Sequence, residues 1–321
     1  MKPEEIFADM LVPVICAPMF TVSGPELVTA CGKAGIMGVL PAGTARTAEE
    51  FSGWVDQVSA DLAAHADKTG KPAGPWAANL SAGSALRNGE ERAKAEIAAC
   101  QKHRPKLVIT VGGDPTDLVK IVHDWGGLVF HDVTTLKHTE KAIAAGVDGL
   151  ILIGGGGGGH AGILNPFPFV RAVRKFWDKT IVLAGAMSDG ASVRAAQYLG
   201  ADLVYMGTRF IATQESRAPQ AYKQMIVDSG ITDVLYTPTF THGVPASFMT
   251  ASMRAHGFDP KNLPPAPKRG ETPLTVKAWK DVWAAGQGVA LIDDIPTVAD
   301  LVARLHKEYL AAAKPRGYGR G

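Results

Sequence analysis

The residue pattern with the clearest chemical meaning is a run of six glycines, Gly154–Gly159, followed directly by His160. Glycine has no side chain, so this loop lets a flat ring approach the backbone closely, at an entropic cost. An imidazole beside such a ligand can act as a base or hold a substrate. We therefore predict His160 as the catalytic residue. The alternatives are a flexible loop without a ligand and a structural histidine.

Two pairs of small residues indicate a phosphate site. Gly185-Ala186 and Gly207-Thr208 each follow a short apolar run, and small residues let backbone N–H groups approach phosphate oxygens. The threonine adds a hydroxyl donor. Asn79, which also follows an apolar run, is a neutral donor and acceptor that suits the edge of a heterocycle. Tight turns without a ligand, and a turn cap in the case of Asn79, remain the alternatives.

The sequence lacks the residues that several other catalytic mechanisms need. No lysine follows an apolar run, as a Schiff-base enzyme would need, and Asp132 and Asp189 alone are too few carboxylates for a magnesium site. Cys16, Cys31 and Cys100 form no Cys-x-x-Cys pair, so the sequence predicts no metal site. With so few ionisable side chains, a bound cofactor is expected to supply the chemistry.

The elements that position these residues alternate between short apolar strands and helices. Uniformly apolar strands indicate a sheet covered on both faces, and eight units by about residue 210 favour a closed barrel over an open sheet. We therefore predict the α/β class and a (β/α)8 TIM barrel. The predicted strands are Val14–Ala17, Ile36–Leu40, Trp76–Asn79, Leu107–Thr110, Leu128–His131, Gly149–Ile153, Thr180–Ala184 and Leu203–Met206.

The alternation stops after Phe210. Residues 236–242 alternate threonine with aromatics, and residues 259–273 are rich in proline and lysine without periodicity. We interpret this part as a small second lobe inserted over the barrel mouth. The predicted organisation is a barrel over residues 1–215, a substrate-covering lobe over 216–290, and a C-terminal helix over 291–321 that returns to the barrel.

Composition excludes several classes of protein. The 321 residues carry a formal net charge of +2, and charged residues make up 20%, so no basic face for nucleic acid is expected. The N-terminus lacks the basic start and apolar run of a secretory signal, and the apolar runs are too short to span a membrane. An odd, sparse set of cysteines indicates a reducing compartment. Together these features predict a cytoplasmic protein.

The motifs together resemble the nitronate monooxygenase family, formerly called 2-nitropropane dioxygenases, whose members are FMN-dependent barrel oxidoreductases. The resemblance extends over nearly the whole chain and is most specific in Gly158-Gly159-His160-Ala161-Gly162 and in Met206-Gly207-Thr208-Arg209-Phe210. It implies non-covalent FMN in the barrel, bound by Ala17, Pro18, Met19, Asn79, Asp132, Gly158, Gly159, Gly185, Ala186, Met206, Gly207, Thr208 and Gln287.

The resemblance also implies a reaction. A family member oxidises alkyl nitronates with O2 to a carbonyl compound and nitrite, with His160 as base or substrate anchor. Relatives with the same Gly-Gly-His motif are NAD(P)H-dependent flavin reductases that act on quinones or enoyl thioesters, which is the first alternative function. A phosphate-binding barrel without redox activity is the second. The sequence does not determine the oligomeric state and leaves a homodimer open.

The sequence departs from the family pattern at two predicted flavin neighbours. Ile153 stands where many members carry Gln or Asp, and Asp132 stands where some relatives carry Lys. A negative charge at Asp132 would disfavour an anionic reduced flavin. Binding of FMN is still expected, whereas the choice of substrate is left open by these two positions.

Overall fold

A closed barrel of parallel strands forms the body of the molecule in the computed structural model, which describes residues 2–83, 89–267, 271 and 274–313. Strands β1 to β8 pair in chain order, and β8 pairs with β1 to close the barrel. The predicted (β/α)8 barrel of the α/β class is therefore confirmed. The strands are β1 (Val14–Cys16), β2 (Met37–Pro41), β3 (Trp76–Ser81), β4 (Leu107–Val111), β5 (Leu128–Val133), β6 (Gly149–Ile153), β7 (Thr180–Ala184) and β8 (Leu203–Met206).

Each barrel strand buries both of its faces. On β5, Leu128 and Phe130 fill the barrel interior, whereas Val129 and Val133 pack in the layer between the sheet and the helices. This alternation follows from the two-residue period of a strand, and it places Asp132 on the inner face. Burial of each large apolar side chain contributes about 1.5–3 kcal/mol, which explains why the strands read as continuous apolar runs.

Helices surround the barrel, and several of them begin at a side-chain cap. Thr47 accepts a hydrogen bond from Glu50 N at the start of α3, and Gly70 ends that helix in the left-handed conformation. The helices are α1 (Pro3–Phe7), α2 (Pro25–Lys33), α3 (Ala48–Thr69), α5 (Glu90–His103), α6 (Thr116–Asp124), α7 (Leu136–Ala144), α8 (Pro166–Val173), α9 (Gly190–Leu199), α10 (Thr208–Ile211), α11 (Gln220–Val227), α12 (Thr250–Ala255) and α13 (Val298–Ala311), with 3-10 turns η1 (Ala42–Thr44), η2 (Ile231–Asp233) and η3 (Gln287–Leu291).

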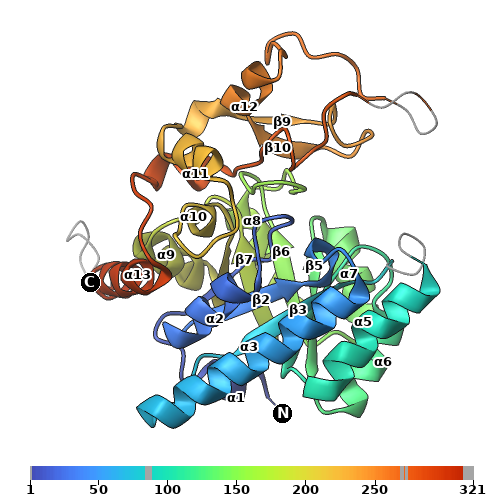
Figure 1. Cartoon of the computed structure of the whole chain (residues 1–321), viewed down its shortest axis with the longest axis vertical. Coiled ribbons are helices and arrows are strands. Elements are labelled where there is room, and N and C mark those ends of the chain that lie inside the picture. Colours follow the sequence, from blue (N-terminus) through green and yellow to red (C-terminus); the bar gives the residue numbers. More distant parts are fainter. Residues whose placement is uncertain (1, 84–88, 268–270, 272–273, 314–321) are drawn as a thin grey trace.

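The chain after β8 builds a lobe over one end of the barrel (Figure 1). Its sheet is an antiparallel pair, β9 (Val234–Thr237) and β10 (Ala246–Met249), and Phe240, Phe248 and Met253 lie in its apolar core. Two backbone hydrogen bonds between Gly159 and Ser247 join this lobe to the glycine run. The boundaries at 215/216 and 290/291 stay a prediction, and residues 314–321 of the last segment lie outside the described residues.

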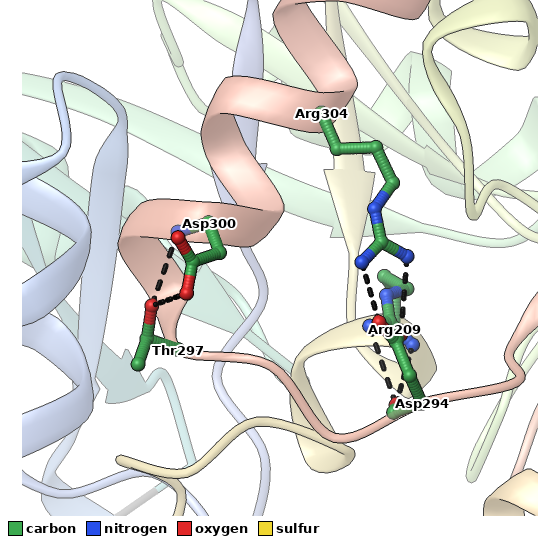
Figure 2. Close-up of polar contacts among 5 residues, drawn as sticks. All are labelled: Arg209, Asp294, Thr297, Asp300 and Arg304. Carbon is green, nitrogen blue, oxygen red and sulfur yellow. Dashed lines mark hydrogen bonds and ion pairs between the residues drawn. The ribbon is translucent and has the colours of Figure 1, made fainter.

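Helix α13 returns the chain to the barrel, where it packs against α9 and α2. Thr297 caps its first turn by accepting a hydrogen bond from Asp300 N (Figure 2). Both carboxylate oxygens of Glu215 lie 3.0 Å from Val298 N, so an acidic side chain also accepts a hydrogen bond from the first turn of this helix. No helix in the described part of the chain has the length and apolar character that a bilayer crossing requires.

Candidate active site

A cavity of about 650 Å³ lies at the carboxyl ends of the barrel strands and is closed in part by residues of the lobe. Its size falls within the range of small-molecule sites, and this end of a barrel is where active sites form. The structure brings most of the predicted site residues to this one cavity. Those that line it are Ala17, Pro18, Met19, Asn79, Asp132, Gly158, Gly159, His160, Gly185, Ala186, Gly207 and Thr208.

Two predicted cofactor residues do not line the cavity. The side chain of Met206 is fully buried in the layer between sheet and helices, because it alternates with Tyr205, which faces inward. The backbone N–H of Gln287 donates to Gly156 O at 2.8 Å, so this residue holds the backbone of the glycine run without lining the cavity. Met206 O accepts a hydrogen bond from Ala17 N and thereby holds the first loop of the site in place.

The glycine run is ordered by its backbone rather than left as a loose loop. Gly154 N donates to Ala184 O at 2.9 Å, and Gly155 N donates to Leu164 O at 2.6 Å. A Cβ on Gly158 would lie 2.8 Å from Gly286 N, and a Cβ on Gly286 would lie 2.6 Å from the carbonyl oxygen of Gly156. Glycine is therefore required where the run packs against the segment after the lobe.

The two small-residue pairs lie directly beside the glycine run: a Cβ on Gly185 would lie 3.0 Å from Gly154 O, and a Cβ on Gly158 would lie 3.3 Å from Thr208 Oγ1. Gly185 has a φ of +114°, and Ala186 adopts the left-handed region with a φ of 57°, an uncommon conformation for a residue with a Cβ. Thr208 Oγ1 accepts a hydrogen bond from Gly286 N at 2.9 Å, which leaves the hydroxyl hydrogen free to donate. The predicted phosphate-binding residues thus share one wall of the cavity.

His160 lies at the cavity mouth with an exposed side chain. Its Nδ1 lies 3.3 Å from the carbonyl oxygen of Pro245, and a carbonyl oxygen only accepts, so Nδ1 carries the hydrogen in this contact. In the neutral ring Nε2 then has the lone pair. The imidazole also packs edge-on against Trp279, with ring centroids 5.1 Å apart. This arrangement presents a base, Nε2, held in a set direction.

Aromatic side chains complete the mouth of the cavity. Trp279 contacts Phe20, Phe248 and His160, with ring centroids 5.1 to 6.3 Å apart. Trp279 and Phe20 line the cavity, and neither was predicted as a site residue. Trp279 lies between the aperiodic residues 259–273 and the predicted C-terminal helix, where the sequence predicts no strand end or helix face that could assign it to the site.

The cavity floor carries three polar side chains from barrel strands. Asn79 Nδ2 donates to Ile109 O at 3.2 Å, which leaves its amide oxygen as an acceptor. Asp132 Oδ1 and the Tyr205 hydroxyl are buried and have no hydrogen-bond partner among the described residues. Burial raises the pKa of Asp132 to about 7 and raises the pKa of Tyr205 well above its usual value, the latter also through the nearby Asp132.

A charged cluster fixes the segment after η3 against the barrel (Figure 2). Arg209 follows Thr208 directly, its side chain is 2% exposed, and its Nη2 lies 2.9 Å from Asp294 Oδ1. Arg304 on α13 binds the other oxygen of the same carboxylate. The hydrogen bond from Arg304, together with the charge of Arg209, lowers the pKa of Asp294. The cluster therefore ties the segment that follows η3 to the barrel.

The residues at this site fit a flavin. The orphaned oxygens of Asp132 and Tyr205 require partners, and the polar edge of a ring supplies them. The glycine run leaves a wall without side chains, and the wall with Gly207 and Thr208 offers small residues to a phosphate. No cluster of three or more His, Cys, Asp or Glu side chains suited to a metal occurs among the described residues.

Comparisons with known proteins agree with this assignment. A family model described as nitronate monooxygenase matches residues 5–308. A nitronate monooxygenase of Pseudomonas aeruginosa is 28% identical over 340 residues, covering 92% of this chain and 95% of that protein. One of Paraburkholderia phytofirmans is 28% identical over 238 residues, which span 67% of this chain and 63% of that protein.

A solved structure supports the fold. Nitroalkane oxidase from Streptomyces ansochromogenes superimposes with a TM-score of 0.76 at 23% identity, over 95% of this chain and 98% of that one. At this identity the likeness speaks for the architecture alone, while the family model covers nearly the whole chain. The chain therefore belongs to the nitronate monooxygenase family and is a flavin-dependent oxidoreductase.

Proposed function

We propose that the enzyme binds FMN without a covalent bond and oxidises alkyl nitronates with O2 to a carbonyl compound and nitrite. The observation that carries the proposal is the position of His160, whose Nε2 is free at the mouth of a glycine-walled cavity. The family to which the chain belongs supports the same reaction. When bound, FMN supplies the redox chemistry, the passage of electrons from substrate to O2.

The chain's own residues bind the cofactor in this proposal. The backbone of Gly207, the backbone around Gly185 and the Thr208 hydroxyl face the phosphate, because small residues at these strand ends allow a close approach. Asn79 offers its amide oxygen to a ring N–H. The glycine run would offer a wall without side chains to the ring.

His160 handles the proton of the substrate. With a neutral nitroalkane, Nε2 accepts the proton from the carbon next to the nitro group, which yields the nitronate and the imidazolium. The imidazolium is then a positive charge beside the nitronate anion. Within the described part of the chain, no lysine or arginine lines the cavity, so His160 is the cationic group available there.

The mouth of the cavity favours substrates with an apolar substituent. Trp279, Phe20 and Val111 line it, and none of them offers charge to a substrate. An alkyl or aryl group on the nitronate carbon would gain about 25 cal/mol for each Å² of apolar surface that these residues bury. We therefore expect activity to increase with chain length over the first few methylene groups.

Anaerobic titration of the purified enzyme tests the proposal. We expect the protein to be yellow, and propyl-2-nitronate to bleach the oxidised flavin absorbance within the mixing time, with recovery of the colour and release of nitrite when O2 is admitted. NADH added in place of the nitronate serves as the comparison. Rapid bleaching by NADH, with none by the nitronate, would instead establish an NAD(P)H-dependent reductase.

A further inference from the structure

Asp132 is a carboxyl group inside the barrel for which the proposed reaction has no role. It lines the cavity and lies on the inner face of β5, in line with Leu128 and Phe130. Its Oδ1 is buried and has no hydrogen-bond partner among the described residues. A buried oxygen left without a partner costs about 1–3 kcal/mol, so the cavity wall presents a polar atom here that a bound ligand would satisfy.

The surroundings of Asp132 contain no positive charge that would stabilise a carboxylate. The neighbouring strands β4 and β6 carry no titratable side chain. Across the barrel, the Tyr205 hydroxyl is the titratable group that faces it, with Cys16 close to that tyrosine. His160 is the remaining ionisable group other than tyrosine along the cavity wall, at its mouth.

Helices α6 and α7 pack on the other side of β5, away from the cavity. The histidines on that side have partners of their own, and the charged residues Asp124, Lys137 and Glu140 of these helices are exposed to solvent. His131 Nδ1 lies 2.8 Å from Thr110 Oγ1, His123 bonds Asp148, and His138 bonds a threonine of the preceding turn. None of these groups is a hydrogen-bond partner of Asp132, whose Oδ1 is buried and unpaired among the described residues, and burial raises the pKa of this carboxyl to about 7.

We propose that Asp132 serves as a carboxylic acid that donates its O–H to an acceptor on the ring bound in the cavity, and that loss of this proton weakens binding of the ring. The inference rests on the proposed function, since it takes this ring to be a flavin. The pyrimidine edge of a flavin carries carbonyl oxygens and a ring nitrogen that accept hydrogen bonds. A carboxylate has no hydrogen to donate and would repel these acceptors.

The two orphaned oxygens on the cavity floor then have complementary tasks. The Tyr205 hydroxyl stays protonated because burial raises its pKa, so it remains a donor over the whole working range. Asp132 is the group whose donor capacity changes near neutral pH. Asn79 supplies an acceptor in the same floor. The site would therefore bind a ring with both acceptor and donor atoms most tightly below the pKa of Asp132.

Binding of riboflavin to the apoprotein tests the proposal, because riboflavin lacks the phosphate that itself titrates near pH 6. Quenching of riboflavin fluorescence reports the Kd between pH 5.5 and pH 9. We expect the Kd of the wild type to rise about tenfold per pH unit above pH 7, as linkage to one proton requires. In Asp132→Asn, which keeps an N–H donor and cannot ionise, we expect a constant Kd.

Asp124→Asn is the matched control, since Asp124 is an exposed carboxylate at the end of α6. It should reproduce the pH dependence of the wild type. A wild-type Kd that does not change with pH would overturn the inference while leaving the proposed function intact. A protein that binds neither riboflavin nor FMN at any pH would overturn the proposed function, and this inference with it.

An infrared measurement keeps the proposal testable if Asp132→Asn does not fold. The difference spectrum of the wild-type apoprotein between pH 6 and pH 9 should show a protonated-carboxyl stretching band that is lost at the higher pH. Ordinary aspartates and glutamates are ionised throughout this range, so they do not contribute. The lack of such a band would show that Asp132 does not change its protonation state between pH 6 and pH 9, which contradicts the proposal.

Discussion

At the scale of single residues, the catalytic proposal depends on the two nitrogen atoms of His160 having different partners. Nδ1 is turned toward the Pro245 carbonyl, and Nε2 is left for the substrate. The packing of the ring against Trp279 restricts its orientation from a second direction. Both contacts come from the lobe. His160 itself follows barrel strand β6, whereas Pro245 and Trp279, which fix its orientation, lie about 85 and 119 residues later in the chain.

Replacement of His160 with Asn separates these roles. The amide nitrogen of Asn can keep the contact with Pro245, whereas the base at Nε2 is lost. We expect kcat/KM with neutral nitroethane to fall by about 100-fold or more, the range for a general base, with a smaller loss on pre-formed ethyl nitronate. FMN binding should persist, since the phosphate wall is unchanged.

Steady-state oxygen uptake with the two substrate forms measures this difference. His242→Asn is the control, because His242 is exposed in the lobe with a left-handed φ of 50° that Asn tolerates. Turnover of neutral nitroethane at the wild-type rate in His160→Asn would remove His160 from the base role.

At the scale of elements, the barrel depends on helices that approach each other through glycine. A Cβ on Gly190, at the first residue of α9, would lie 2.3 Å from Tyr309 N and 2.4 Å from Leu305 O on α13. Both obstacles are backbone atoms, which cannot move aside as a flexible side chain would. Helix α13 thus reaches its place against α9 only because this position has no side chain.

Alanine substitutions at two helical glycines test this dependence. Gly190→Ala should lower the free energy of unfolding by about 1–3 kcal/mol, the cost of overpacking a well-packed contact. Gly53→Ala is the matched control, because a Cβ at Gly53 on α3 meets no atom within 4 Å and alanine favours helix. Urea denaturation should therefore show opposite signs, and equal stabilities for both variants would contradict the packing argument.

At the scale of the whole molecule, the Arg209–Asp294–Arg304 cluster ties the returning C-terminal segment to the barrel (Figure 2). The Arg209 side chain is almost completely buried, and burial lowers its pKa while Asp294 opposes this effect. A buried cation needs its partner, because loss of that partner leaves the charge uncompensated. The cluster therefore connects folding of the last segment to the order of residues beside the cavity.

Asp294→Ala should destabilise the protein by about 2 kcal/mol, less than for a fully buried pair because Asp294 reaches solvent. We also expect weaker FMN binding, since the segment with Gly286 would lose its anchor. Thermal unfolding and FMN titration measure the two effects. Asp293→Ala, at the exposed neighbouring position, should change stability by no more than about 0.5 kcal/mol. Equal effects of the two substitutions would exclude a specific role for the cluster.

Much of the architecture could be predicted from local pattern. Strands Gly149–Ile153, Thr180–Ala184 and Leu203–Met206 occur with the predicted bounds. Apolar runs of strand length between helical stretches need no tertiary information, because a covered parallel sheet requires them. Other bounds moved by a few residues. For residues 236–242 the sequence shows only an alternation of threonine and aromatic residues. In the structure, strand β9 begins earlier, at Val234, and pairs with β10, which the sequence does not predict.

The sequence by itself determined that the barrel exists and that its strand ends share one face, since parallel strands bring their carboxyl ends together. That is why His160, Asn79 and Thr208 could be assigned to one cavity. Only the tertiary structure decided which side chains complete it. Trp279 reaches the mouth and Tyr205 the floor through folding of the lobe and closure of the barrel. The unpaired state of Asp132 likewise depends on atoms brought together from distant strands, which no local pattern encodes.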